Sequence, residues 1–194
     1  VNALQGGFPI SDEPYRTLVF DDVAVPEVPP LLTRAVIATS WSKSLAIPGE
    51  RIGYLAFSPR MPEASELFDA CTFTSRVLGF VNAPALMQRA VVHLQGVMVE
   101  MSQYERKRNR LCDHLTAMGY QLVKPQGAFY IFPRAPGGDD VAFVQALQTK
   151  HILTVPGRGF GTPGHFRIAY CVEDHTIERA MDGFRAVAKE FGVA

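Results

Sequence analysis

The chain has 194 residues, of which 47% are hydrophobic and 20% are charged, a composition typical of globular proteins. Lysine plus arginine and aspartate plus glutamate both number 19, so the formal net charge is zero and neither nucleic acid nor a membrane surface is favoured as a partner. No apolar run approaches the roughly 20 residues that a membrane-spanning helix needs.

The first predicted strand ends at an acidic turn. Residues 1–7 are typical of the tail of a helix and a turn, and residues 8–10 form a short apolar run before Ser-Asp-Glu-Pro-Tyr. Ligands of open α/β sheets gather at the carboxyl ends of strands, so Asp12 and Tyr15 are candidates for binding a cofactor. The structural alternative is a turn residue before proline and a packed aromatic. Residues 16–30 form a connector, because their Val-Pro and Pro-Pro pairs exclude a regular helix over much of it.

Two further strands frame a polar loop. Residues 35–39 and 52–57 are apolar at nearly every position, which predicts buried strands. The loop between them carries Ser40, Lys43 and, after a Pro-Gly turn, Arg51. A lysine amine can form a Schiff base with a carbonyl, and an arginine with serine hydroxyls suits a phosphate. Carbonyl plus phosphate indicates pyridoxal 5′-phosphate, although a single lysine in a loop is more often a solvated charge.

Three helices are predicted next. They cover residues 62–77, a stretch from Asn82 or Pro84 to residue 94, and residues 97–118, with Gly119 as a typical helix end. The basic cluster at residues 105–110 lacks an aromatic platform, so we expect a solvated helix face and not a nucleic-acid site.

The remainder is predicted to mix strands and helices. The expected strands are residues 120–123, 128–132, 152–155 and 166–171, and the expected helices are residues 139–150 and 173–191. The glycine-rich loop at 157–164 is no phosphate-binding P-loop, because no Lys-Ser/Thr follows and a strand, not a helix, comes after it.

Arg167 stands inside an otherwise apolar strand. Burying an arginine is costly unless it has a partner, which makes Arg167 a candidate ligand-binding residue. The alternative is an arginine on the solvent face of an edge strand, and the alternation of residues does not separate the two.

Several of these motifs together resemble one family. S-x-S-K-x-x-x-x-P-G-x-R-x-G at 40–53, D-x-x-Y at 12–15, Y-x-x-x-R-x-x-L-x-x-x-L-x-x-x-G at 104–119, P-G-x-x-F-G at 156–161 and R-I-x-Y at 167–170 resemble class I and II aminotransferases of the aspartate aminotransferase type, which are fold-type-I pyridoxal phosphate enzymes. The resemblance covers nearly all of this chain but only the second half of the family pattern. We therefore expect a fragment or a truncated gene product.

The resemblance implies an α/β fold in two parts. Residues 1–95 would be the last part of the large cofactor-binding domain with its α/β sheet, and residues 96–194 the interdomain helix and the α+β C-terminal small domain. The implied reaction transfers an amino group from an L-amino acid to a 2-oxo acid in a ping-pong sequence. Aspartate is the expected donor by family frequency, with aromatic and other amino acids as competitors.

The resemblance also assigns roles to residues. Lys43 would hold the cofactor and act as general base, Asp12 would pair with the pyridine nitrogen, and Tyr15 would donate to the ring oxygen. Ser40 and Arg51 would hold the phosphate, and Arg167 the substrate α-carboxylate. The phosphate-loop backbone, the ring-stacking aromatic and the ring-oxygen asparagine of the family belong to the half not covered here.

These gaps bear on activity and partners. The family is homodimeric with shared active sites, so the isolated chain is expected to be inactive or weakly active. Cys71, Cys112 and Cys171 are widely spaced and indicate reduced thiols in a cytoplasmic protein. Three alternatives stay open: a fold-type-I C–S lyase, a non-enzymatic aminotransferase-like domain of a regulator, and a stable fragment without function.

Overall fold

A computed structural model describes residues 7–193, except for the side chains of residues 29 and 30. The chain divides into two compact units, which we call unit 1 (Val1–Val99) and unit 2 (Glu100–Ala194). The assignment of residues 1–95 and 96–194 to the two domains of the family stays a prediction. The helix end expected at residues 1–7 lies outside the described residues, apart from Gly7.

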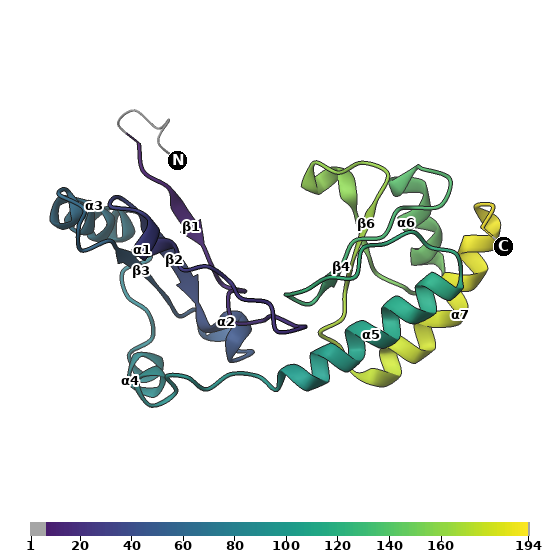
Figure 1. Cartoon of the computed structure of the whole chain (residues 1–194), viewed down its shortest axis with the longest axis horizontal. Coiled ribbons are helices and arrows are strands. Elements are labelled where there is room, and N and C mark those ends of the chain that lie inside the picture. The colour runs from purple at the N-terminus through teal and green to yellow at the C-terminus, as the bar shows by residue number, and fades with distance from the viewer. Residues whose placement is uncertain (1–6, 194) are drawn as a thin grey trace. The chain divides into compact units, whose positions relative to one another are not determined.

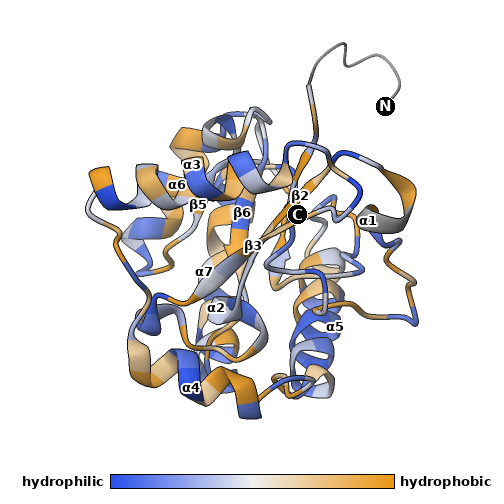
Figure 2. Cartoon of the chain, turned by 90° about the vertical axis from the view of Figure 1, so that its left-hand side faces the viewer, coloured by the Kyte–Doolittle hydropathy of each residue, from blue (hydrophilic) through white to orange (hydrophobic). Residues whose placement is uncertain are grey.

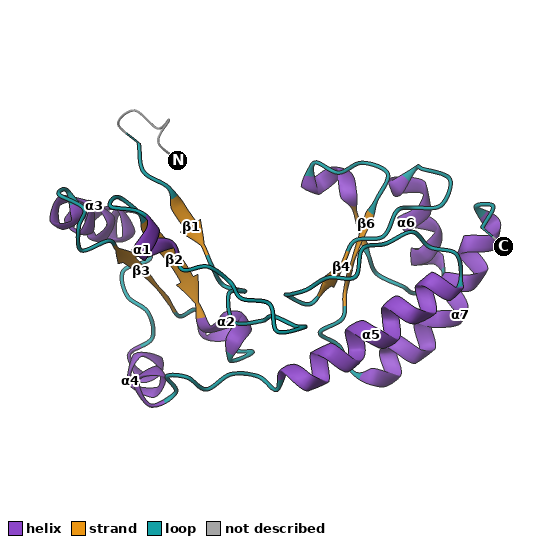
Figure 3. Cartoon of the chain, viewed as in Figure 1, coloured by secondary structure: helices purple, strands orange, loops and turns teal. Residues whose placement is uncertain are grey.

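Unit 1 contains a small mixed sheet with helices around it (Figures 1 and 3). Its described elements are β1 (Ile10–Asp12), α1 (Val28–Leu31), β2 (Val36–Ser40), α2 (Trp41–Ser44), η1 (Pro48–Glu50), β3 (Gly53–Phe57), α3 (Ala64–Val77) and α4 (Ala85–His93). Lys43 thus lies in a single helical turn and not in an irregular loop. A second such turn, α1, interrupts the expected connector.

The sheet brings two strand ends to one edge. Its order is β1-β2-β3, with β1 parallel to β2 and Asp12 opposite Ala38. Strand β3 runs antiparallel to β2 and places Gly53 opposite Ser40. A side chain at position 53 would bring its Cβ to 2.5 Å from the Thr39 carbonyl, so glycine is needed there. Because β1 and β2 are parallel, the segments after Asp12 and after Ser40 leave the sheet at the same edge.

Unit 1 exposes many apolar side chains. The strands at 35–39 and 52–57 form as predicted, but their expected burial is wrong for β3, where Tyr54 and Leu55 are 50% and 48% exposed. Helix α3 has no buried residue, and Phe73 is 67% exposed. On α4, where orange marks apolar residues in Figure 2, Leu86 and Val92 are also exposed. A continuous apolar run predicts that both faces are covered, and the described residues leave them partly open. No helix within residues 7–193 is both long and apolar enough to cross a membrane.

Unit 2 packs three helices with a small antiparallel sheet (Figure 1). Its described elements are α5 (Met101–Ala117), β4 (Tyr130–Ile131), α6 (Asp140–Thr149), β5 (Val155–Pro156), η2 (Gly157–Phe160), β6 (Phe166–Ala169) and α7 (Asp174–Glu190). The strand order is β4-β6-β5, so β6 is the central strand. Tyr120, Phe143, Phe166 and Phe184 form a buried aromatic core whose ring centroids lie 5.0 to 6.5 Å apart.

The sequence-based elements of unit 2 were partly wrong. The strand expected at 120–123 is absent from the described structure, although the Gln121 carbonyl accepts a hydrogen bond from the Arg134 amide at 2.8 Å. The strands expected at 128–132 and 152–155 shorten to two residues each. One physical reason is Ala128, whose positive φ of 59° takes the backbone out of the extended region. The helices α6 and α7 follow the prediction closely.

Candidate functional site

Lys43 and Tyr15 lie together at the edge where β1 and β2 end. After Asp12 the chain stays tied to β2, because the Glu13 amide donates to the Ala38 carbonyl (2.8 Å) and the Thr39 hydroxyl donates to the Glu13 carbonyl (3.1 Å). The following turn places the Tyr15 ring centroid 5.7 Å from the Lys43 Nζ. Two segments that the sequence assigned separately to a cofactor site are therefore brought into contact.

Asp12 and its neighbour Glu13 differ in their surroundings. The Glu13 carboxylate accepts hydrogen bonds from Ser11 Oγ (2.8 Å) and from Arg16 Nη1 (3.1 Å). Asp12 is exposed at the end of β1, and its carboxylate has no hydrogen bond or ion pair to any of the residues 7–193. The carboxylate of Asp12 can therefore accept a partner from outside unit 1, whereas that of Glu13 holds the turn.

Ser40 and Arg51 flank the lysine turn. Ser40 precedes α2 in an extended conformation, and its hydroxyl does not cap that turn. Arg51 adopts a left-handed conformation (φ 49°), is exposed, and donates from Nη1 to the Pro48 carbonyl at 2.8 Å. A non-glycine residue in this region stores strain, a feature that concentrates at functional sites.

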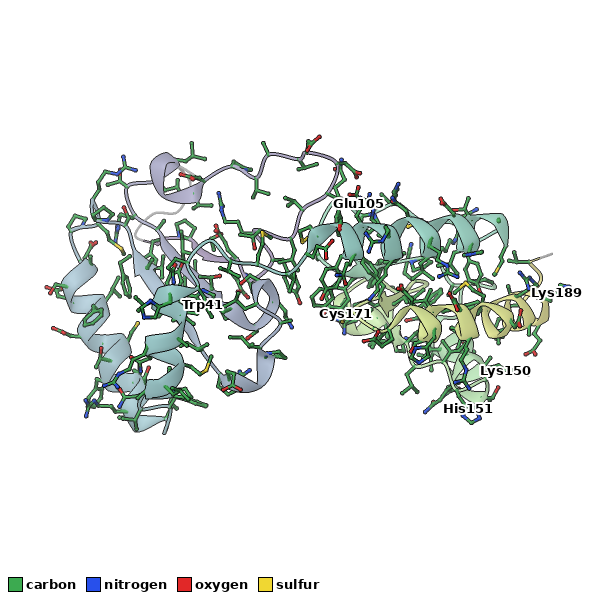
Figure 4. All side chains as sticks on the ribbon, turned by 90° about the horizontal axis from the view of Figure 1, so that it is seen from below. Trp41, Glu105, Lys150, His151, Cys171 and Lys189 are labelled. Atoms are coloured by element: carbon green, nitrogen blue, oxygen red, sulfur yellow. The ribbon has the colours of Figure 1, made fainter. Side chains whose placement is uncertain are left out.

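A hollow of about 370 Å³ lies in unit 1 beside these residues. Ser40 and Ser44 line it together with Trp41 and Tyr54, whose ring centroids are 5.3 Å apart; Trp41 is labelled in Figure 4. Asp12, Tyr15, Lys43 and Arg51 do not line this hollow. The candidate residues lie together where β1 and β2 end, and of them only Ser40 lines this hollow.

Arg167 lies on the central strand of unit 2. The alternative of an arginine on an edge strand is therefore wrong, since β6 pairs with β4 on one side and with β5 on the other. Its guanidinium carbon is 4.5 Å from the Tyr130 ring centroid and 4.4 Å from that of Phe160. Among residues 7–193 no carboxylate pairs with it. Arg167 is a half-buried cation with two aromatic rings against its guanidinium.

Sequence reasoning missed an ion pair between α6 and the glycine-rich loop. Asp140 is 1% exposed and accepts hydrogen bonds from the Arg158 amide (2.9 Å) and Nη2 (2.9 Å). These bonds, those from the Arg158 side chain above all, hold the pKa of Asp140 well below its usual range. The Asp-Asp pair indicated only a helix cap, a role that Asp139 does fill for Val141 and Ala142.

Arg108 corrects the expectation of a fully solvated basic face. Its side chain is 0% exposed and donates to Glu105 Oε1 (3.0 Å), Asn109 Oδ1 (3.1 Å) and the Pro125 carbonyl (3.0 Å). Figure 4 marks Glu105 on α5. The signal was present in the sequence, because residue 108 shares helical spacing with Leu111 and Leu115 and so lies on the buried face.

The cysteines are free thiols in the structure. Cys112 is buried, which raises the pKa of its thiol and keeps it protonated, while Cys71 and Cys171 are more accessible. None of these residues contributes to the groups described above.

Comparisons with known proteins agree on one family. The family model for aminotransferase class I and II matches residues 1–184. An aromatic-amino-acid aminotransferase of Thermococcus litoralis is 33% identical over 93% of this chain and 49% of its own length. An aspartate aminotransferase of Pyrococcus abyssi is 30% identical over 93% of this chain and 49% of its own length.

Solved structures give the same result. An amino transferase from Eubacterium rectale superposes with a TM-score of 0.89 at 39% identity, covering 95% of this chain and 46% of that one. The aspartate aminotransferase of Thermotoga maritima gives a TM-score of 0.76 at 28% identity, covering 93% and 47%. The chain thus spans about half the length of the relatives it matches. With the family model matching nearly its whole length, the chain belongs to the class I and II aminotransferases.

Proposed function

We propose that this chain forms part of a pyridoxal phosphate-dependent aminotransferase, which moves an amino group from an L-amino acid to a 2-oxo acid. The observation that carries the proposal is the meeting of Lys43 with Tyr15, beside Asp12, where the parallel strands β1 and β2 end. Family membership supplies the reaction class, and this edge supplies its chemical groups. Two of the three alternatives from the sequence, a C–S lyase and a regulator domain, gain no support from the described residues.

The groups at this edge fit the cofactor. Lys43 offers an amine for the aldehyde, and the open carboxylate of Asp12 can pair with a protonated pyridine nitrogen. The Tyr15 hydroxyl can donate to the ring oxygen. Ser40 and Arg51 offer a hydroxyl and a fork of N–H donors for a phosphate. When bound, pyridoxal phosphate supplies an electron sink for the carbanion that forms at the substrate Cα.

The residues of the chain then divide the work. Lys43 would hold the cofactor through its amine and would take the proton from the substrate Cα as general base. Asp12 keeps the positive charge on the ring nitrogen, which favours that proton transfer. Arg167 binds the α-carboxylate with paired N–H donors and so orients the Cα–H bond. Its lack of a carboxylate partner among residues 7–193 supports this role.

The proposed protein needs more than this chain. The chain covers about half the length of its relatives, and of the candidate residues of unit 1 only Ser40 lines the hollow beside them. We therefore propose that the active protein is a cytoplasmic homodimer containing the other half of the family fold, and that the isolated chain has little or no turnover. L-aspartate and an aromatic amino acid are the donors to test first, since relatives of both names match.

The test is covalent capture of the cofactor. The 194-residue chain is mixed with pyridoxal phosphate and reduced with borohydride, and peptide mass spectrometry locates the adduct. We expect a stoichiometric adduct on Lys43 that is absent from Lys43→Ala. Lys124→Ala, which removes an exposed lysine from unit 2, is the matched control and should keep the adduct.

Each outcome has a clear meaning. Selective labelling of Lys43, reduced by Asp12→Ala, supports the assigned site. Equal labelling of Lys43 and Lys124 would show that the strand edge has no special affinity for the cofactor, and the assignment of Lys43 would fall.

A further inference from the structure

Arg167 is held between two aromatic rings that come from different elements. Tyr130 belongs to β4, the neighbour of β6 on one side, and Phe160 closes η2, which follows β5, the neighbour on the other side. The guanidinium carbon is almost equally distant from the two ring centroids, at 4.5 and 4.4 Å. Aromatic faces attract a guanidinium but accept no strong hydrogen bond, so its N–H donors stay available for an anion.

Each of the two rings is backed by further aromatic contacts. The Tyr130 ring contacts the Phe129 ring, with centroids 4.8 Å apart. The Phe129 ring in turn stacks on the Tyr104 ring of α5, with centroids 6.0 Å apart. Behind Phe160 stands Phe132, at 5.9 Å and edge to face. The two contacting rings therefore belong to a packed series of rings in unit 2, which limits how far either can move.

The position of Phe160 is also fixed through the backbone. Phe160 is 46% exposed, so burial alone does not hold it. The loop that carries it is tied to α6 by the buried Asp140, which accepts hydrogen bonds from the Arg158 amide and from Arg158 Nη2, both at 2.9 Å. Asp140 thus fixes the backbone of the loop two residues before Phe160.

We propose that Tyr130 and Phe160 are positioning residues that clamp the guanidinium of Arg167 for a carboxylate, and that Asp140 sets the Phe160 side of this clamp. The inference rests on the proposed role of Arg167 in binding the α-carboxylate. The two rings restrict the rotamers of Arg167 in the ligand-free protein. Less side-chain entropy is therefore lost when a carboxylate binds, which favours binding. Within residues 7–193 no carboxylate pairs with the guanidinium, so none of the described carboxylates competes with the ligand.

The test follows the Arg167 side chain directly. The Nε–Hε signal of Arg167 in the 194-residue chain is assigned by its loss in Arg167→Lys, and its heteronuclear NOE reports the order of the guanidinium. Succinate, an unreactive dicarboxylate, is the probe for binding. We expect an ordered signal in the wild type, and in Phe160→Leu a disordered signal with an apparent Kd for succinate raised about threefold to tenfold.

Conservative variants separate clamping from general loosening. Tyr130→Phe and Phe160→Tyr keep a ring at each position and should keep both the order and the affinity. Tyr130→Leu should behave like Phe160→Leu. Phe191→Leu removes a ring that packs on Phe143 at 5.2 Å and is the control for lost aromatic packing in unit 2. It should leave the Arg167 signal unchanged. If Tyr130→Leu does not fold, Phe160→Leu decides alone, because Phe160 is nearly half exposed.

The two hypotheses fail in different ways. Succinate binding that is lost in Arg167→Lys but equal in the wild type and both leucine variants would overturn the clamp and leave the role of Arg167 intact. A signal whose order depends on the rings, in a chain that does not bind succinate, would overturn the carboxylate-binding role. Disorder of the Arg167 signal in Phe191→Leu would reduce the effect to general loosening and overturn the clamp as well.

Discussion

The backbone of His151 has a left-handed conformation, which costs free energy for a residue with a Cβ but not for glycine. It follows α6 with a positive φ of 61°, and the amides of His151 and Ile152 return to the carbonyls of Gln148 and Leu147 at 2.9 and 3.1 Å. This is the helix end at which glycine is usual, because a Cβ disfavours the left-handed conformation. We expect His151→Gly to raise the free energy of unfolding of unit 2 by about 1 kcal/mol.

The measurement is a urea titration followed by far-UV circular dichroism. His151 and Lys150 are marked at the end of α6 in Figure 4. The matched control is Gln148→Gly, which puts the same residue inside the helix and should lower the free energy of unfolding by about 0.5 to 1 kcal/mol. Destabilisation by both glycines would show that His151 makes a contact that outweighs its backbone strain.

Arg108 is a buried cation whose donors are used by the protein itself. Its acceptors include a carboxylate, an amide oxygen and a backbone carbonyl, and its side chain has no exposed area. Arg108→Ala leaves a cavity and an unsatisfied Pro125 carbonyl, so we expect the free energy of unfolding to fall by about 2 to 4 kcal/mol.

Arg108→Lys should recover little of this loss, because one ammonium cannot reproduce a planar fork that reaches three acceptors. Glu105→Gln is the comparison at the other end of the ion pair. The Glu105 side chain is 41% exposed, so this change should cost less than about 1 kcal/mol. Equal losses for Arg108→Ala and Glu105→Gln in urea titrations would contradict a mainly buried role for Arg108.

At the scale of elements, α6 and the glycine-rich loop are joined by one titratable group. The hydrogen bonds from Arg158 lower the pKa of Asp140 in the folded state. A carboxylate with a lowered pKa adds stability above its unfolded pKa, and this contribution is lost as the pH falls through the folded one. Asp140→Asn should therefore have a lower free energy of unfolding than the wild type at pH 7. The difference between the two proteins should shrink progressively below about pH 4.

Thermal unfolding at a series of pH values checks this. Asp182→Asn serves as the control, because the Asp182 side chain is 94% exposed in an ion pair with Arg185 one helical turn along α7. Its stability difference from the wild type should stay small at every pH. A gap for Asp140→Asn that is constant down to pH 2 would mean that its charge does not hold the loop.

The sequence predicted long elements better than short ones. Helices α6 and α7 carry enough periodic apolar positions to identify them, and Asp139 marks the start of α6. Strands β4 and β5 have two residues each, too few for a periodic pattern, and their bounds depend on pairing with β6. The partners of Arg167 and of Asp140 are distant in sequence, so residue types alone could nominate Arg167 but could not find its two rings.

At the scale of the whole molecule, the two units differ in how much apolar surface they bury. Most of the fully buried apolar residues that the structure describes lie in unit 2, and few lie in unit 1. Since buried apolar area is the main source of stability, unit 1 should unfold first. Trp41, the one tryptophan of the sequence, lies in unit 1 and reports its unfolding separately.

We therefore expect the Trp41 fluorescence transition in urea to come at a lower concentration than the main far-UV dichroism transition. His151→Gly should shift the second transition and leave the first in place. Coincident transitions by both probes would show a single cooperative unit and contradict the division.

The exposed apolar residues of unit 1 also predict self-association. On α3, Phe73 and Val77 are 67% and 68% exposed and are four residues apart, so they lie on the same helix face. Exposed apolar patches of this kind promote contacts between molecules.

The isolated chain should show an apparent mass in sedimentation that rises with concentration, and Phe73→Lys with Val77→Lys should reduce this rise. Val123→Lys, at an 85% exposed position in unit 2, is the control. An equal reduction by Val123→Lys would place the association in unit 2, and a constant monomer mass would show that the open face of α3 is too small or too irregular to bind a second chain.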